Sequence, residues 1–189
     1  MFVRRQITKV GIFTVLALFF IIGTTLAETA EDYYKQGQMA VNQGDVQKAS
    51  SCFTKAIELK SDYADAYFFR GGTCVAQQKF EQGISDFTKA IELKHDDAVT
   101  YGFRGGAYLK LNNYSQAIAD FTKAIELKPD GAALYYSRSL CYFYGKEYGK
   151  ALDDLDKAET LGYGQSNDAQ KSRLLELKKE LKEVSEKDK

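Results

Sequence analysis

One eight-residue stretch decides the fold of this chain. The sequence Phe-Thr-Lys-Ala-Ile-Glu-Leu-Lys occurs unchanged at Phe53–Lys60, Phe87–Lys94 and Phe121–Lys128, and a degenerate copy follows at Leu155–Leu161. The alanines of successive copies lie 34 residues apart, at Ala56, Ala90, Ala124 and Ala158. Four copies in one register indicate an internal repeat, in which each unit buries its apolar face only by stacking on its neighbours.

The residues upstream of each alanine recur with the same spacing. An aromatic residue begins each predicted first helix, a small residue follows it, and a second small residue lies early in the second helix. These positions are Tyr33, Tyr67, Tyr101 and Tyr135; Gly37, Gly71, Gly105 and Ser139; and Ala49, Gly83, Ala117 and Ala151. The pattern predicts helix pairs that approach closely, since packing must return more than the roughly 1 kcal/mol that glycine costs a helix.

In period and pattern, the chain resembles the tetratricopeptide repeat family over about residues 30–165. The resemblance implies an all-α fold, a right-handed superhelical solenoid of helix-turn-helix units. The units expected are 30–63, 64–97, 98–131 and 132–165. The fourth departs from the family pattern at Ser139, Leu155 and Tyr163, so we expect it to be the least regular repeat.

The remaining residues, 166–189, predict a C-terminal capping helix. Leu174, Leu177 and Leu181 recur at three- and four-residue steps, and the other face is rich in lysine and glutamate. The end of a helical stack needs such a solvating cap. The alternative is a zipper-like dimerisation helix.

The first 27 residues have the pattern of an export signal. Arg4, Arg5 and Lys9 precede an apolar run that begins at Val10, and Ala27 ends a stretch of small residues. Because the run is about 13 residues, short of the roughly 20 that span a bilayer, we expect a signal peptide, residues 1–27, and an exported protein, periplasmic or secreted. The alternative is an uncleaved membrane anchor with the repeats facing the exterior.

Composition and motifs argue against several functions. Lys+Arg and Asp+Glu both number 26, so no net charge attracts nucleic acid, and the single histidine excludes a site built from several histidines. No motif places a nucleophile beside a base or spaces metal ligands correctly. We therefore expect no enzyme activity, no cofactor and no metal. Cys52, Cys74 and Cys141 are expected to be buried and free, with one disulfide as the alternative that export allows.

Three arginines are each followed sixteen residues later by an aspartate. The pairs are Arg70 with Asp86, Arg104 with Asp120 and Arg138 with Asp154, whereas Gln36 and Cys52 replace both partners in the first repeat. Joint presence and joint absence predict an ion pair between the two helices of each hairpin. The alternative is that the arginines bind an acidic ligand.

The resemblance places function in the concave groove lined by the first helices, which in this family binds extended peptides or a partner's helix. Lys35, Asn42 and Lys110 are too few for the carboxylate clamp that some members use. The candidate groove residues are mainly aromatic or apolar: Tyr34, Phe68, Phe69, Phe103, Leu109, Tyr136, Phe143 and Tyr144. We expect a scaffold or adaptor that binds an apolar or aromatic peptide or helix of another protein. The alternatives are a membrane-anchored, chaperone-like or complex-assembly subunit, and self-association through the same aromatic side chains.

Overall fold

The computed structural model describes residues 28–165 and 167–187, so the predicted export signal lies outside the described part of the chain. Within that part, every regular element is an α-helix. The helices are α2 (Ala30–Asn42), α3 (Val46–Leu59), α4 (Ala64–Ala76), α5 (Phe80–Glu92), α6 (Ala98–Lys110), α7 (Tyr114–Leu127), α8 (Ala132–Tyr144), α9 (Tyr148–Thr160) and α10 (Asp168–Lys187).

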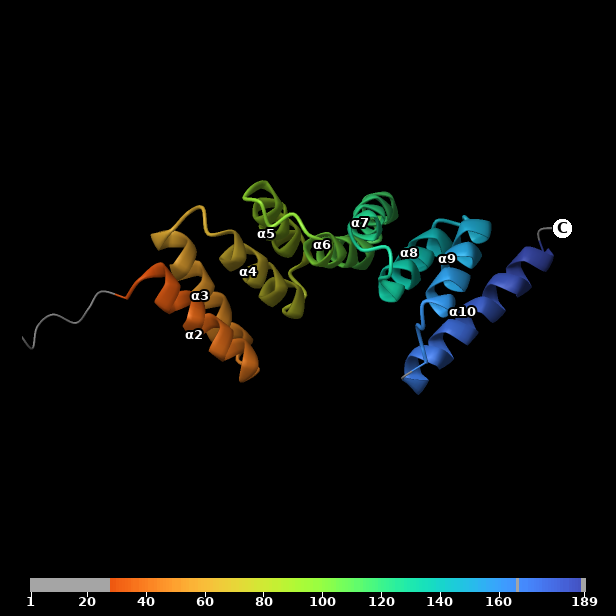
Figure 1. Cartoon of the computed structure of the whole chain (residues 1–189), viewed down its shortest axis with the longest axis horizontal. Coiled ribbons are helices and arrows are strands. Elements are labelled where there is room, and N and C mark those ends of the chain that lie inside the picture. The colour runs from red at the N-terminus through yellow and green to blue at the C-terminus, as the bar shows by residue number, and fades with distance from the viewer. Residues whose placement is uncertain (1–27, 166, 188–189) are drawn as a thin grey trace, which may run out of the picture.

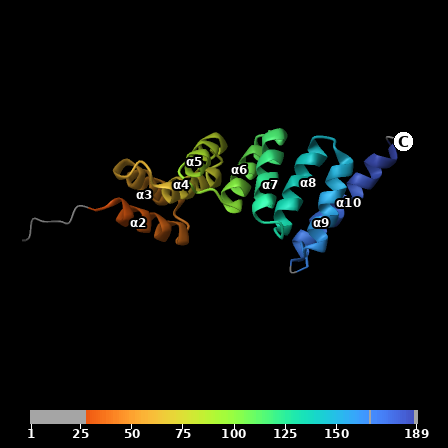
Figure 2. The same cartoon turned by 45° about the horizontal axis from the view of Figure 1, so that its top comes forward.

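The helices form four hairpins, α2–α3, α4–α5, α6–α7 and α8–α9, followed by α10. Each helix packs mainly against the helices next to it in the chain, and the first helices α4, α6 and α8 also contact one another in turn. Figures 1 and 2 show the hairpins succeeding each other along the long axis, with α10 at the end opposite α2. The prediction of an all-α repeat solenoid with a C-terminal capping helix is confirmed.

The small residues of the first helices allow the second helices to lie close. A Cβ added at Gly37 would lie 2.5 Å from the Phe53 ring, and one added at Gly71 would lie 2.8 Å from the Phe87 ring. Both phenylalanines belong to the repeated eight-residue stretch and are fully buried. Each glycine therefore makes room for an aromatic ring between the two helices of its own hairpin.

A left-handed residue joins the two helices of each hairpin. Positive φ angles occur at Gly44, Gln78, Asn112 and Lys146, one 34-residue period apart. Only the first repeat supplies glycine, which adopts this conformation without steric cost. The turn is therefore kept in all four repeats, although three of them place a strained side chain in it.

The predicted Arg–Asp pairs are confirmed in all three repeats. Arg104 Nε and Nη2 donate to the two carboxylate oxygens of Asp120 at 2.8 and 2.7 Å, and the pairs at Arg70 and Arg138 have the same two-bond geometry. The three aspartates are buried. This geometry fixes each first helix against its second helix.

Each arginine also reaches the preceding repeat, which the sequence analysis did not foresee. The third guanidinium nitrogen, Nη1, donates to a threonine in the second helix of the repeat before it. The acceptors are Thr54 for Arg70 at 3.5 Å, Thr88 for Arg104 at 3.0 Å and Thr122 for Arg138 at 3.0 Å. We call these contacts, with the aspartates, the arginine ladder. It joins hairpin to hairpin as well as helix to helix.

At the C-terminal end, α10 completes the stack. Leu174, Leu177 and Leu181 form a buried cluster with Ala151 and Leu155. Lys178 of α10 binds Asp156 at 2.6 Å, and Asp156 occupies the position that threonine holds in the ladder of earlier repeats. The helix therefore covers the last hairpin with both apolar and ionic contacts.

The three cysteines are buried and free, as expected. Cys52 occupies the aspartate position of the first repeat, where no arginine is present to be paired. Burial raises the pKa of the Cys141 thiol to about 12, so this thiol stays protonated at neutral pH. These side chains act as small apolar residues of the core.

Candidate functional site

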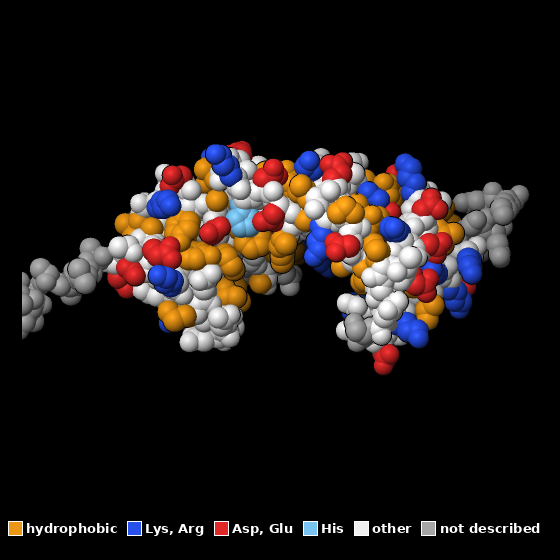
Figure 3. All heavy atoms as spheres, in the orientation of Figure 1, with side chains coloured by type: hydrophobic (Ala, Val, Ile, Leu, Met, Phe, Trp, Pro, Cys, Tyr) orange, Lys and Arg blue, Asp and Glu red, His pale blue; other side chains and the backbone are white. Residues whose placement is uncertain are grey.

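The first helices of repeats two to four carry few charges. Helices α4, α6 and α8 contain the three ladder arginines, each bound to its aspartate, and otherwise only Asp65 and Lys110. The second helices α3, α5 and α7, by contrast, each carry lysine and glutamate side chains that are not part of the ladder. Figure 3 shows hydrophobic side chains gathered over the N-terminal hairpins, beside the hollow that separates them from the C-terminal hairpins. The surface of the first helices is therefore the apolar surface of the stack.

An open apolar pocket of about 310 Å³ lies in this surface, between repeats one, two and three. It is bordered by residues of α2, α3, α4, α5 and α6. The residues are Val41, Val46, Phe68, Phe69, Gly72, Thr73, Ala76, Phe87 and Phe103. Three of the predicted groove residues, Phe68, Phe69 and Phe103, therefore come together at one site.

Phe68 lies at the centre of the aromatic contacts around the pocket. Its ring centroid is 5.3 Å from that of Phe69, 5.9 Å from Phe87 and 5.7 Å from Phe103. Phe87 is fully buried, whereas Phe103 is 48% exposed. The pocket thus has a fixed aromatic wall on the core side and a partly uncovered ring at its mouth.

Glycine keeps the pocket open on the side of α4. A Cβ added at Gly72 meets no atom within 4 Å, and the same is true at Gly106, its equivalent one repeat later. The neighbouring Gly71 differs, because its added Cβ would touch Phe87. Gly71 is therefore required for packing, whereas Gly72 leaves space in the groove.

Valine at position 46 also widens the pocket. The equivalent positions in the other repeats hold aromatic residues, Phe80, Tyr114 and Tyr148. The smaller side chain of Val46 leaves room beside Phe69 and Val41. The pocket therefore depends on two small residues on different helices: Gly72, which recurs as Gly106, and Val46, which alone among its equivalents is not aromatic.

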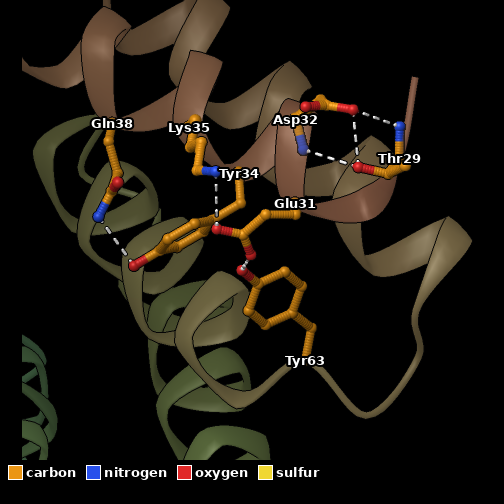
Figure 4. A network of polar contacts seen from close by, with 7 residues as sticks. All are labelled: Thr29, Glu31, Asp32, Tyr34, Lys35, Gln38 and Tyr63. Carbon is orange, nitrogen blue, oxygen red and sulfur yellow. Dashed lines mark hydrogen bonds and ion pairs between the residues drawn. The ribbon is translucent and has the colours of Figure 1, made fainter. Parts of the chain in front are cut away.

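Tyr34 extends the aromatic surface toward the N-terminal end. Its ring centroid lies 5.7 Å from Phe69 and 5.0 Å from Tyr63. Gln38 Nε2 donates to the Tyr34 hydroxyl at 2.9 Å. Glu31 binds both Tyr63 and Lys35, and Figure 4 shows these contacts. Burial raises the pKa of Tyr34 to about 12, and burial together with the Glu31 hydrogen bond raises the pKa of Tyr63.

The single histidine packs against the pocket residue Phe68 and is partly exposed. The His95 ring stacks on Phe68 with centroids 4.7 Å apart. Its nitrogens lie 3.3 Å from Asp65 and 3.1 Å from Asp97, and Thr100 Oγ1 is 2.6 Å from Nδ1. The polar contacts of His95 therefore fix a ring that supports one face of Phe68.

The other predicted groove residues lie away from the pocket. Leu109 packs with the cluster of Ala117, Phe121 and Cys141. Tyr136 and Phe143 join the cluster that contains the α10 leucines, and burial raises the pKa of Tyr136. Tyr144 is 54% exposed and stacks on Tyr114 with centroids 5.6 Å apart. The structure thus separates the predicted residues into a pocket at repeats one to three and an aromatic surface at repeat four.

Six of the nine pocket residues are not among the groove residues predicted from the sequence: Val41, Val46, Gly72, Thr73, Ala76 and Phe87. Val41 could have been predicted from the sequence, because it is in register with Leu109 and Phe143, both of which were assigned to the groove. Thr73 is hidden from such reasoning, because it is buried and its hydroxyl donates to the Arg70 carbonyl at 2.7 Å.

Over residues 28–165 and 167–187, no helix is both long enough and apolar enough to cross a bilayer. The same residues contain no group of three or more histidine, cysteine or acidic side chains placed to hold a metal ion.

A stack of helical hairpins with an apolar groove defines a protein-interaction scaffold of the helical-repeat class. Two sequence models, both described as tetratricopeptide repeat, match residues 34–98 and 98–130, which together are slightly more than half of the chain. The chain belongs to the tetratricopeptide repeat family. A comparison with curated proteins gives no significant match.

Solved structures agree with this fold. MamA is similar with a TM-score of 0.71 and 21% identity, over 86% of this chain and 95% of that one. The TPR2B domain of yeast Sti1, solved as a complex with pHsp70, has a TM-score of 0.59 and 26% identity, over 64% and 97%. The TPR domain of Arabidopsis OM64 has a TM-score of 0.57 and 28% identity, over 59% and 93%.

Proposed function

We propose that the groove of repeats one to three binds an apolar or aromatic segment of another protein, and that the chain is a non-enzymatic adaptor. The observation that carries this proposal is the open pocket beside Gly72, with Phe103 half exposed at its mouth. An exposed aromatic surface on a folded domain usually marks an interaction site. The complex of the Sti1 domain with pHsp70 supports a protein partner, although this chain lacks the polar residues of a carboxylate clamp.

The binding energy should come from apolar contact. Aromatic side chains covered by a partner are the commonest hot spots, each worth roughly 2 kcal/mol or more. None of the nine residues that border the pocket is charged, so they offer a ligand no ion pair. Affinity should therefore change little with salt, unlike that of a clamp built from exposed charges.

The test fills the pocket without disturbing the core. Gly72→Phe puts a ring into open space inside the pocket, and Gly106→Phe puts the same ring at the equivalent position outside it. A photo-crosslinking residue at position 103 then reports partner capture in the native extract. We expect one discrete crosslinked partner, lost with Gly72→Phe and kept with Gly106→Phe, while both variants remain folded by circular dichroism.

A second filling variant approaches from another helix. Val46→Phe supplies the kind of side chain that the other repeats carry, so it should be tolerated by the fold. Equal capture by the wild type and by both filling variants would contradict the groove and place the binding surface elsewhere. A shift of oligomeric state that follows the same variants would identify self-association instead.

We propose also that the chain is exported, as the basic residues and short apolar run of residues 1–27 indicate. Mass spectrometry of the native protein decides between the two forms. A mature chain that starts at Glu28 supports a periplasmic or secreted adaptor. An intact N-terminus in the membrane fraction supports the anchored, chaperone-like or complex-assembly subunit.

A further inference from the structure

The chemistry of the pocket constrains the conformation of what it binds. Of the nine residues that border it, only Thr73 has a polar side-chain atom, and its hydroxyl is already bound to the Arg70 carbonyl. All nine residues belong to helices, so most of their backbone N–H and C=O groups are already hydrogen-bonded within those helices. The pocket thus offers a ligand apolar contact and almost no hydrogen bonds.

An extended segment bound in this pocket would leave many of its backbone N–H and C=O groups without hydrogen-bond partners. Each backbone N–H or C=O group buried without a partner costs about 1–3 kcal/mol. An α-helix satisfies these groups within itself and presents side chains alone. We infer that the segment bound in this groove is an amphipathic α-helix, an inference that rests on the proposed function and makes it more specific.

The fourth repeat shows that the equivalents of pocket positions can contact the apolar side chains of another helix, in its case α10, which packs mainly on α9 at the end of the stack. The fourth-repeat equivalents of Phe68 and Gly72 are Tyr136 and Leu140, and both belong to the cluster formed with the leucines of α10. Where repeat four presents Leu140, repeat two presents Gly72 and open space. A leucine-striped helix at repeat two would therefore have room to insert a large apolar side chain of its own.

Exposed charges at the ends of α4 and α6, two of the first helices that border the pocket, would give a bound helix a preferred orientation. Asp65 and Asp97 lie at the N-terminal ends of α4 and α6, and Lys79 and Lys110 lie at or just beyond their C-terminal ends. A bound helix with basic residues along one side and acidic residues along the other would match these charges. Because these charges are exposed, salt should slow association through them, whereas the apolar contacts that hold the bound helix should depend little on salt.

The test compares two libraries of displayed 18-residue peptides on the purified protein. One library has a helix-forming alanine, glutamate and lysine frame, with large apolar residues varied at i, i+3, i+4 and i+7. The other has the same composition with a central proline, which disrupts a helix by about 3 kcal/mol. Enriched peptides are then measured against the wild type, Gly72→Phe and Gly106→Phe.

We expect binders from the helical library alone, with affinity reduced roughly 30-fold by Gly72→Phe, the equivalent of one hot-spot contact, and unchanged by Gly106→Phe. Inserting proline into an enriched peptide should abolish its binding. Proline-library peptides that are blocked by Gly72→Phe would overturn the helix inference and leave the groove function standing. Binders from either library that ignore Gly72→Phe would contradict both.

Discussion

The guanidinium of Arg104 donates two hydrogen bonds to the carboxylate of Asp120, at 2.8 and 2.7 Å, across the helices of one hairpin. Its third nitrogen donates to Thr88 of the preceding repeat at 3.0 Å. The Asp120 side chain is 8% exposed and that of Arg104 is 16% exposed. One side chain therefore fixes both the shape of a repeat and its position on the repeat before it.

We predict that this pair is strongly coupled. Arg104→Ala leaves the buried Asp120 carboxylate without its partner and should reduce the free energy of unfolding by about 3 kcal/mol. Asp120→Ala should cost a similar amount, and the double variant should cost much less than the sum. Urea unfolding of the four proteins measures the coupling. Additive losses would show that the pair contributes no coupling energy. Thr88→Val removes only the contact between repeats and should reduce the free energy of unfolding by about 1 kcal/mol.

Replacing either of two adjacent glycines in α4 by alanine should change the stability of the chain, but in opposite directions. Gly72→Ala adds a methyl group to open space, so it should stabilise the chain by up to about 1 kcal/mol through helix propensity. Gly71→Ala places the same group 2.8 Å from the Phe87 ring and should destabilise it. Thermal unfolding of both variants gives the signs. A stabilising Gly71→Ala would mean that the hairpin relaxes without cost at this contact.

Adjacent leucines in α10 provide a comparable contrast. Leu174 is 2% exposed in the cluster with Leu155, whereas Leu175 is 52% exposed. Leu174→Ala should destabilise the chain by roughly 2–4 kcal/mol because it leaves a cavity, and Leu175→Ala should change stability by less than about 0.5 kcal/mol. Denaturant unfolding tests both. A loss at Leu175→Ala as large as that at Leu174→Ala would instead show that the exposed leucine is covered by another copy of the chain.

Tyr34 should make the chain less stable at alkaline pH. Its pKa is raised to about 12 in the fold, mainly by burial, whereas an unfolded tyrosine ionises near its ordinary value of about 10. Between these values the folded chain holds a proton that the unfolded chain has lost, so the free energy of unfolding falls as pH rises. Tyr34→Phe should make this fall shallower. Urea unfolding at pH 8 and pH 11 measures the difference, and identical slopes would exclude a contribution from Tyr34.

The repeat architecture was predictable because each repeat position occurs four times in the sequence, so that equivalent residues can be compared. Arg70, Arg104 and Arg138 share a register with their aspartates, and the first repeat lacks both members of the pair. That comparison predicted a contact which the structure confirms. The threonine acceptors were equally regular, since each lies sixteen residues before its arginine, but they were hidden inside the unchanged eight-residue stretch.

The groove was less predictable, because its shape depends on contacts between repeats. Tyr136 and Phe143 have the same register as pocket residues, yet they pack in the cluster at α10. Nothing in the repeat pattern fixes where a non-repeated helix packs. The pocket itself results from what is missing, a side chain at Gly72 and a ring at Val46, and such spaces appear only when neighbouring repeats are assembled.

The arginine ladder also determines where the chain can change in length. The first repeat has Gln36 instead of arginine, and the last has Asp156 instead of threonine, bound by Lys178. A copy of residues 64–97 inserted after Asp97 would bring an arginine for Thr88 and a threonine for Arg104, so each ladder contact would be kept. The same unit added before α2 would bring a threonine to Gln36, and one added after α9 would separate Asp156 from Lys178 of α10. Duplication in the middle of the stack therefore keeps every ladder contact, whereas duplication at either end changes the contacts made there.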